Sequence, residues 1–195
     1  METKNDNLSP ERSLAIIESM IREAKGKVSN SSFYFLLWGW VIALCDFAMY
    51  YIMSFTSFPQ YAPAVWTICI PAWIVTMIYG GRQDRERGMT SHLDRINMWL
   101  WISMAITICP IWIFGAKINW MINALILMPV GAATFVSGII IQFRPLLWGA
   151  IVFWTAGITC YFLNPTDQFL VGGVAMILGY LLPGYLLKYQ KENHA

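Results

Sequence analysis

Six apolar stretches, separated by polar pieces, fill most of this 195-residue chain. They cover residues 33–55, 62–79, 96–114, 118–143, 146–163 and 169–187. A helix rises about 1.5 Å per residue, so about 20 residues cross the roughly 30 Å of hydrocarbon in a bilayer. Each stretch is close to that length. The sequence therefore predicts an all-α, polytopic membrane protein with six transmembrane helices.

The positive charges of the polar pieces alternate from one side of the predicted spans to the other. Of the 13 Lys and Arg residues, all except Lys117 lie before the first span, after the last, or in the second and fourth loops. Under the positive-inside rule these pieces are cytoplasmic, so we expect both termini in the cytoplasm. The chain is 57% hydrophobic and 12% charged, with a net charge of +2. We attribute this small positive excess to the cationic cytoplasmic pieces that orient the protein in the membrane. We therefore expect no nucleic acid partner.

The first polar piece has the pattern of an amphipathic helix. Ser9 is a suitable N-cap, and Pro10 suits the first helical position. Apolar residues then recur at three- and four-residue steps, forming a candidate interaction face of Leu14, Ile17, Ile21, Ala24 and Val28. This helix is too polar to span, so we expect it to lie on lipid, on the bundle or on a partner protein.

The polar piece and the spans define the predicted organisation of the chain. Gly26 and residues 29–32 predict a break before the first span. We therefore divide the chain into a cytoplasmic amphipathic helix with its linker (1–32), a transmembrane bundle (33–187) and a cytoplasmic tail (188–195). Short connections favour antiparallel neighbours, which predicts three hairpins. Residues 36–39 and 146–149 are both Leu-Leu-Trp-Gly, a hint of internal duplication.

Asp46 is the one ionisable acid or base deep in a predicted span. A charge at that depth costs about 2.5 to 3.5 kcal/mol, so intramembrane carboxylates usually face a bundle interior or a watery cavity. Gly39, Ala43 and Tyr50 share its helix face. We expect Asp46 to be a neutral structural hydrogen-bond donor, either to a carbonyl or to a hydroxyl such as that of Thr76 or Thr134. A proton or cation relay, or a polar spot near water, are the alternatives.

Prolines and small residues mark the other irregular points of the spans. Pro71, Pro110, Pro129 and Pro183 each remove a backbone donor, which either kinks the packing or opens a binding site as in transporters. Stripes of glycine and alanine predict close helix contacts, within one bundle or between protomers.

Motifs for catalysis, metals or cofactors are not evident in the sequence. The four cysteines lie inside predicted spans without Cys-x-x-Cys spacing, so a disulfide framework or zinc site is not expected; a pairing of Cys109 with Cys160 is the one alternative. His92 is a lone loop histidine. We therefore expect no enzyme, no metal and no cofactor.

Four runs resemble an uncharacterised family of small bacterial six-helix inner-membrane proteins that carry an N-terminal amphipathic helix. They are residues 13–21 (SLAIIESMI), 38–40 (WGW), 143–146 (FRPL) and 182–188 (LPGYLLK). The resemblance covers nearly the whole chain. It implies a multi-pass protein of the bacterial inner membrane, and it carries over no activity and no functional residue.

Two functions fit these patterns. The first is a non-enzymatic accessory or regulatory membrane protein that acts through the face of residues 10–28, with membrane lipid, a second copy or another protein as partner. The second is a small oligomeric transporter or channel that uses Asp46 and the proline-broken helices. The first fits a membrane body that is poor in polar groups and joined to an organised cytoplasmic face.

Overall fold

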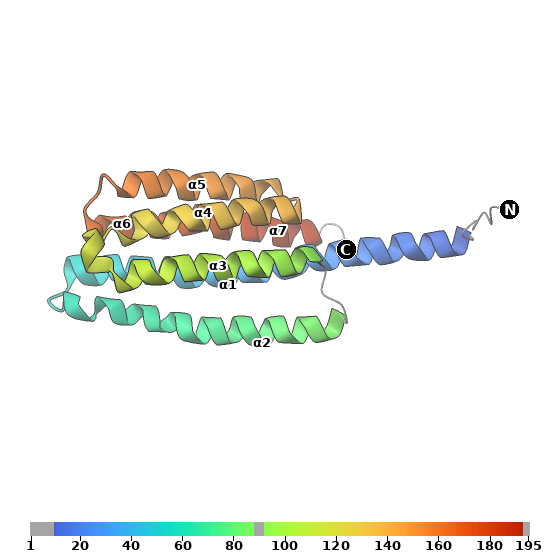
Figure 1. Cartoon of the computed structure of the whole chain (residues 1–195), viewed down its shortest axis with the longest axis horizontal. Coiled ribbons are helices and arrows are strands. Elements are labelled where there is room, and N and C mark those ends of the chain that lie inside the picture. The colour runs from blue at the N-terminus through green and yellow to red at the C-terminus, as the bar shows by residue number, and fades with distance from the viewer. Residues whose placement is uncertain (1–9, 88–91, 193–195) are drawn as a thin grey trace.

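The computed structural model describes residues 10–87 and 92–192, and it describes side chains for residues 32–82, 85 and 93–189. Helices make up almost all of these ranges, and no strand occurs in them. The elements are α1 (Pro10–Phe55), η1 (Pro59–Ile68), α2 (Cys69–Arg87), α3 (His92–Ile113), η2 (Gly115–Ile118), α4 (Ile122–Ile141), α5 (Arg144–Cys160), α6 (Pro165–Met176), η3 (Ile177–Leu181) and α7 (Leu182–Glu192). They form an elongated helical bundle (Figure 1). The class predicted from the sequence, all-α, is confirmed.

Five helical segments are long and apolar enough to cross a membrane. They are Ser32–Phe55, Pro59–Arg82, Leu93–Ile113, Ile122–Ile141 and Pro165–Tyr189. A sixth, α5, has 17 residues, which is the lower limit for a span. Each predicted stretch thus overlaps a helical segment of the structure.

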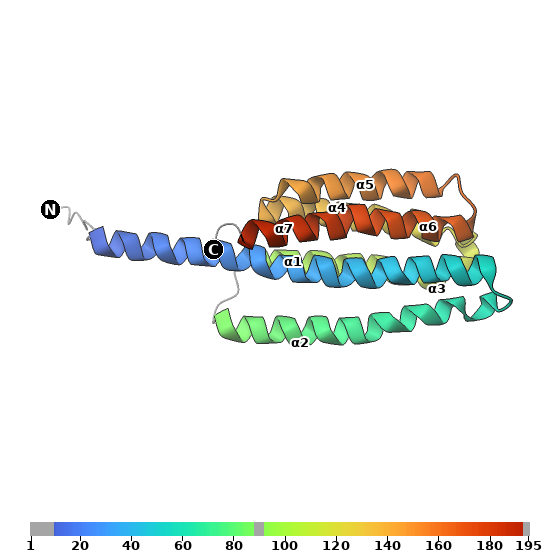
Figure 2. The ribbon, with the colours of Figure 1, turned by 180° about the vertical axis from the view of Figure 1, so that it is seen from behind.

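The predicted break between the amphipathic helix and the first span is wrong. Helix α1 continues through Gly26 and residues 29–32 as one helix of 46 residues. A single glycine costs a helix only about 1 kcal/mol, and serines can bond back to the preceding turn. No proline follows Pro10 until Pro59, so no backbone donor is missing along α1. Its N-terminal part extends well past the other helices (Figures 1 and 2).

The predicted start of the fourth span, residue 118, is also wrong. Helix α4 begins at Ile122, because η2 and two left-handed residues precede it: Asn119 has φ 52° and Trp120 has φ 60°. Left-handed backbone cannot continue a right-handed helix. This turn links α3 to α4.

The turn between α4 and α5 is a tight helix C-cap. Gln142 has φ 59° and donates its N–H to the Ile139 carbonyl, while the Phe143 N–H donates to the Gly138 carbonyl at 3.0 Å. These two bonds are those of a Schellman motif. Pro145 then occupies a first-turn position of α5, where its missing N–H is not needed. The two helices consequently leave the turn antiparallel and pack along their length.

The core lies between α1, α4, α5 and the α6–η3–α7 segment. Helix α4 packs mainly on α5, and α1 packs on α6 and α7 (Figure 2). Large side chains such as Leu127, Leu146 and Phe153 are fully buried there. Helix α3 packs on α4 at one edge of this core. These contacts bury most of the small residues predicted to lie on contact faces, whereas Ala156 is half-buried; the buried ones are Gly131, Gly138, Gly149, Gly172, Ala175 and Gly179.

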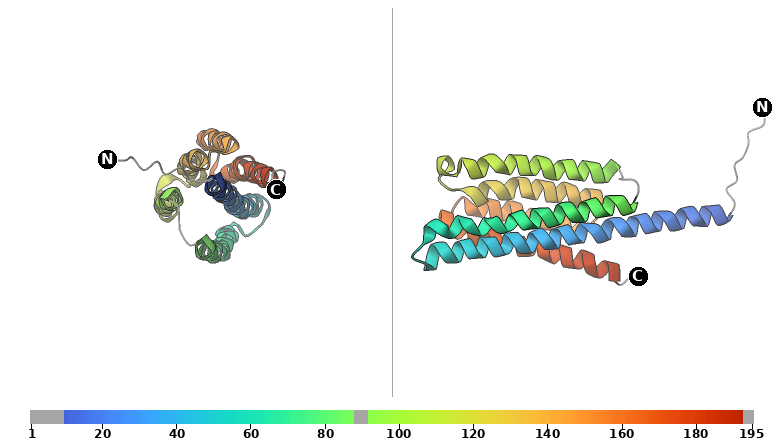
Figure 3. Two further views of the ribbon diagram at one scale, coloured as in Figure 1. Left: turned by 90° about the vertical axis from the view of Figure 1, so that its right-hand side faces the viewer. Right: turned by 90° about the horizontal axis from the view of Figure 1, so that it is seen from below.

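Helix α2 stands at the edge of the bundle (Figures 1 and 3). Its contacts are with α1 and with η1, which precedes it. Most of its apolar side chains are exposed, among them Trp73 at 56%. On α1, Phe33 stacks on Tyr79 with ring centroids 4.0 Å apart, and the Trp38 indole donates to the Thr76 hydroxyl at 3.1 Å.

The last predicted span, 169–187, contains a π-helical segment, η3. Pro183 has no N–H for the Gly179 carbonyl, and its ring would collide with that carbonyl in a regular α-helix; a wider turn relieves both problems. The glycines of the two Leu-Leu-Trp-Gly repeats contact this segment. A Cβ at Gly39 would lie 2.8 Å from a Leu181 methyl carbon, and one at Gly149 would overlap the Gly179 carbonyl oxygen.

Candidate functional site: a buried polar cluster

Asp46 lies in the interior of the bundle. Its side chain is 2% exposed and points from α1 to α6, where the backbone of Gly172 faces it. A Cβ at Gly172 would lie 2.9 Å from Asp46 Oδ2 and 3.0 Å from Asn123 Nδ2. The missing side chain at Gly172 therefore makes the space that the carboxyl group occupies.

Asn123 connects the carboxyl group to two other helices. It is the second residue of α4, it is buried, and its amide nitrogen Nδ2 lies beside Asp46 Oδ2 at the backbone of Gly172. The same amide nitrogen, Nδ2, donates to the backbone carbonyl of Gln168 on α6 at 3.0 Å. One asparagine thus links α1, α4 and α6 through polar contacts in an otherwise apolar core.

Gln168 completes the polar cluster of Asp46, Asn123 and Gln168. Its side chain is 1% exposed, and its amide nitrogen lies 3.4 Å from the Leu163 carbonyl oxygen, with the Met121 sulfur as a second neighbour. Its backbone carbonyl accepts from Asn123 and lies 3.9 Å from the Cys160 sulfur. The connection between α5 and α6 is held by these contacts.

Two oxygen atoms of the cluster have no hydrogen-bond partner. They are Oδ1 of Asp46 and Oε1 of Gln168, and both are buried. An unpaired buried polar group costs about 1–3 kcal/mol. Such atoms mark positions where a proton, a water molecule or a small cation would be stabilised.

The cationic side chains that the structure describes lie toward helix ends, and Lys188 is on α7. Arg82, Arg85 and Arg95 flank the α2–α3 connection, Lys117 is in η2, and Arg144 begins α5. Within the described residues, no group of three His, Cys, Asp or Glu side chains is arranged to hold a metal ion. Cys109 and Cys160 are both free, so the pairing considered from the sequence is not formed.

The hydroxyl partners expected for Asp46 bond elsewhere. Thr76 donates to the Ala72 carbonyl of its own helix and accepts from Trp38. Thr134 bonds to the Val130 carbonyl and to the Tyr180 hydroxyl. The two hydroxyl partners suggested for Asp46 are therefore wrong, and the polar group beside it is the Asn123 amide.

The other residues on the predicted Asp46 face of α1 contact the C-terminal segment or lie nearby. Gly39 lies against Leu181 of η3, Ala43 is buried in the core, and Tyr50 is half-buried beside a small cluster at the end of α1. This face of the helix is packed against protein.

Asn123 and Gln168 were missed in the sequence. Asn123 is a polar amide inside a predicted span, but it is not ionisable, and the sequence analysis considered only ionisable residues there. Gln168 fell in the predicted loop 164–168, whereas α6 begins at Pro165 and places it on the first turn. Only the fold brings these two amides to Asp46.

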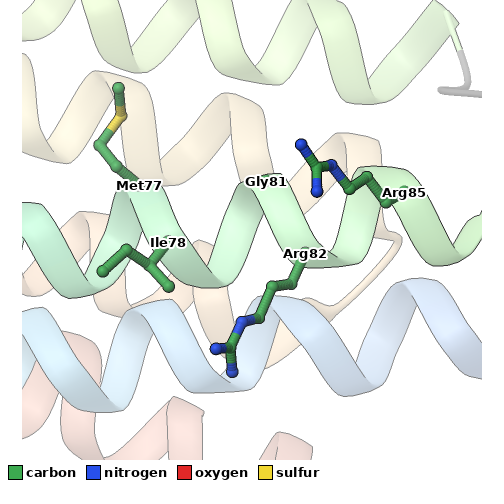
Figure 4. A pocket seen from close by; sticks show the side chains of 5 residues that line it. All are labelled: Met77, Ile78, Gly81, Arg82 and Arg85. Carbon is green, nitrogen blue, oxygen red and sulfur yellow. The ribbon is translucent and has the colours of Figure 1, made fainter.

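Two surface grooves lie apart from the cluster. One, of about 200 Å³, is lined by Met77, Ile78, Gly81, Arg82 and Arg85 on α2, and its two guanidinium groups point in different directions (Figure 4). The other, of about 330 Å³, lies between α5 and α6 and is mostly apolar. Asp46 lines neither groove.

The predicted interaction face of Leu14, Ile17, Ile21, Ala24 and Val28 lies on the N-terminal part of α1. The backbone of these residues is helical, and their side chains lie outside the described part of the structure. His92 begins α3, and its side chain is likewise outside that part.

No family model, curated protein or solved structure matches this chain. The function must therefore be argued from the geometry of the chain itself.

Proposed function

We propose that this chain is a non-enzymatic accessory or regulatory protein of the bacterial inner membrane, which presents the N-terminal part of α1 to a partner protein or to a second copy. In this proposal six helical segments span the bilayer as three antiparallel hairpins, with both termini in the cytoplasm. The resemblance noted in the sequence supports the bacterial source and the topology.

The observation that carries the proposal is the continuity of α1. The helix runs without a break from Pro10 to Phe55, and its candidate span begins at Ser32. Residues 10–31 therefore extend the helix by about 33 Å outside that span. A surface helix that lies flat on lipid needs a bend at the membrane boundary, and α1 has none. A straight extension instead holds its apolar face away from lipid, which favours a protein partner.

The charge pattern of the extension supports the same proposal. Glu18 with Arg22, and Glu23 with Lys27, are opposite charges four residues apart. Such pairs stabilise a solvent-exposed helix by about 0.2–0.5 kcal/mol each. The apolar stripe between them is typical of helices that pack on another helix.

The test compares two double variants of full-length protein purified from native membranes in a mild detergent. Ile17→Glu with Ile21→Glu places charge on the apolar stripe, and Glu18→Gln with Arg22→Gln alters the polar side as the matched control. We expect the first variant to lose a co-purifying protein, or to change oligomeric mass, while the control retains the wild-type complex. Identical complexes for all three proteins would refute the proposal.

A transporter or channel is the second candidate, and the unpaired Oδ1 of Asp46 favours it. A water-filled path would supply that atom with a partner. In a cysteine-free background, single cysteines at Gly39, Ala43 and Tyr50 should then react with a water-soluble thiol reagent. Modification together with an ion flux in proteoliposomes would favour transport over the regulatory function, and unreactive cysteines would exclude a path along this face.

A further inference from the structure

The groove on α2 joins two kinds of surface near the C-terminal end of the helix. Arg82 and Arg85 form its polar half, Met77 and Ile78 form its apolar half, and Gly81 lies between them. Figure 4 shows the two arginine side chains leaving the helix on opposite sides of Gly81 and running back toward the apolar pair. Nothing lies within 4 Å of a Cβ at Gly81, so the floor of the groove is open.

The groove lies where a candidate span ends. The span Pro59–Arg82 includes the apolar pair and ends at the first arginine of the groove. Just before the groove's glycine, Tyr79 stacks on Phe33 of α1 with ring centroids 4.0 Å apart and meets Tyr34 edge-on at 5.8 Å. Tyrosine rings gather at the boundary between hydrocarbon and headgroups. In the proposed membrane topology, the apolar half of the groove therefore faces acyl chains and the arginine half faces headgroups.

The positive charges of the groove are accessible. Arg82 and Arg85 are exposed, and neither forms an ion pair with a side chain that the structure describes. Asp84 and Glu86, the acids nearest in the sequence, occupy helix positions about 100° to either side of Arg85. The two guanidinium groups are thus available to an anion that approaches over the floor of the groove.

We propose that this groove binds an anionic phospholipid of the cytoplasmic leaflet. The phosphate lies between Arg82 and Arg85, and an acyl chain follows the exposed side chains of Met77 and Ile78. Guanidinium groups bind phosphate oxygens through charge-assisted hydrogen bonds. Anionic lipids of the cytoplasmic leaflet attract basic groups that lie just beyond the end of a span.

The two halves of the groove together favour a lipid over a soluble phosphate compound. A soluble compound would contact the arginines alone, because the apolar half lies within the candidate span. A phospholipid covers both halves at once. Access from the bilayer is open, since α2 stands at the edge of the bundle and its contacts are with α1 and η1.

The inference rests on the membrane topology proposed above and does not depend on a partner for the N-terminal part of α1. Reporters of membrane side fused to the two termini test that topology separately. Failure of lipid binding and failure of the topology are therefore distinguishable.

The test measures the lipid that the full-length protein retains in native mass spectrometry, after addition of dioleoyl phosphatidylglycerol or dioleoyl phosphatidylcholine in detergent. We expect the wild type to retain phosphatidylglycerol in preference to phosphatidylcholine. Arg82→Gln with Arg85→Gln should bind phosphatidylglycerol about 30-fold more weakly, because each arginine near anionic headgroups contributes about a fivefold gain in affinity. Arg144→Gln with Lys188→Gln, the matched control, removes the same charge from exposed side chains on α5 and α7 and should keep the wild-type affinity.

A third variant separates binding in the groove from attraction to surface charge. Gly81→Phe keeps both arginines and fills the open floor with a ring. We expect this variant to retain less phosphatidylglycerol than the wild type. Wild-type retention would overturn the proposal, because the lipid would then lie outside the groove.

Three other outcomes would also overturn the proposal. Equal losses in the two double variants would show that overall charge, and not the groove, attracts the lipid. Equal retention of both lipids by the wild type would show that the headgroup is not recognised. Displacement of phosphatidylglycerol by inorganic phosphate, at an ionic strength held constant with chloride, would show that the site takes phosphate without a lipid.

Discussion

At the scale of single residues, the polar cluster depends on one absent side chain. Asp46 and Asn123 both occupy the space beside Gly172, and there is no room for even a methyl group. The carboxyl group is enclosed because the backbone of α6 comes close to it at Gly172, where the Asn123 amide is its polar neighbour. A glycine in this position therefore matters for packing and not for backbone conformation.

Replacing Gly172 by alanine should destabilise the protein by about 1–3 kcal/mol, the usual cost of overpacking a core. The reason is that the new methyl group would lie 2.9 Å from Asp46 Oδ2. Unfolding in a denaturing detergent, followed by tryptophan fluorescence, measures the change. Gly81→Ala is the matched control, since nothing lies within 4 Å of a Cβ there. Equal stability of the two variants would contradict the described packing.

Replacing Asn123 by alanine should lower the free energy of unfolding by about 1–3 kcal/mol, because the Gln168 carbonyl loses its buried donor and Asp46 loses its polar neighbour. Ser103→Ala is the control: the Ser103 hydroxyl is exposed and bonds within its own helix, to the Leu100 carbonyl. We expect that change to stay within about 0.5 kcal/mol. The same unfolding titration measures both, and a neutral Asn123→Ala would show that the hydrogen bonds do not hold the helices together.

The sequence indicated Asp46 as an unusual residue but not its partners. Depth within a span follows from counting along one helix, so an intramembrane acid is visible in the sequence. Contact with Asn123 and Gln168 depends on how three helices rotate about their axes, and on the late start of α4 after the left-handed Asn119 and Trp120.

At the scale of elements, hydropathy located the helical segments well and their ends poorly. Each of the six apolar stretches overlaps a helical segment, and five of these segments are long and apolar enough to cross a membrane. The ends of the helices depend instead on local backbone hydrogen bonds. Gly26 and Ser29 looked like a break, yet each is tolerated within a helix when no proline accompanies it. In the last span, Pro183 did not end the helix, because a π turn accommodates its ring.

A proline at position 29 should break α1 where the sequence suggested a linker. In the helix interior proline costs about 3 kcal/mol and removes one hydrogen bond. Spin labels at Glu11 and Leu44, in a cysteine-free background, should report about 50 Å in the wild type, from 33 rises of a straight helix. We expect Ser29→Pro to shorten and broaden that distance distribution, and Ser29→Ala to leave it unchanged. A broad distribution in the wild type would contradict a continuous α1.

At the scale of the whole molecule, the bundle has a compact part and an open edge. Helices α1, α4, α5 and the α6–η3–α7 segment enclose the core, with α3 beside α4. Helix α2 adds a large exposed apolar surface at the other edge. In the proposed topology that surface faces lipid, which would explain why apolar side chains can stay exposed there.

Reporters of membrane side fused at Met1 and Ala195 should both indicate the cytoplasm, because six spans return the chain to the side where it began. A single cysteine at position 117, in a cysteine-free background, should react with a membrane-impermeant reagent added from outside, since Lys117 lies in the connection between α3 and α4. Labelling of intact and permeabilised cells measures this. Reporters on opposite sides of the membrane would refute the six-span topology.

Helix α1 is continuous from Pro10 past the polar cluster, so a tilt of its packed part would also move its N-terminal part. Pro10 lies 36 residues from Asp46, a distance of about 54 Å along the helix axis. If the helix pivots at Asp46 by about 10°, its tip is displaced by about 9 Å, which is the spacing between packed helices. In that case, gain or loss of a single proton or ion among Asp46, Asn123 and Gln168 would move the tip of α1 far enough to engage or release a neighbouring protein.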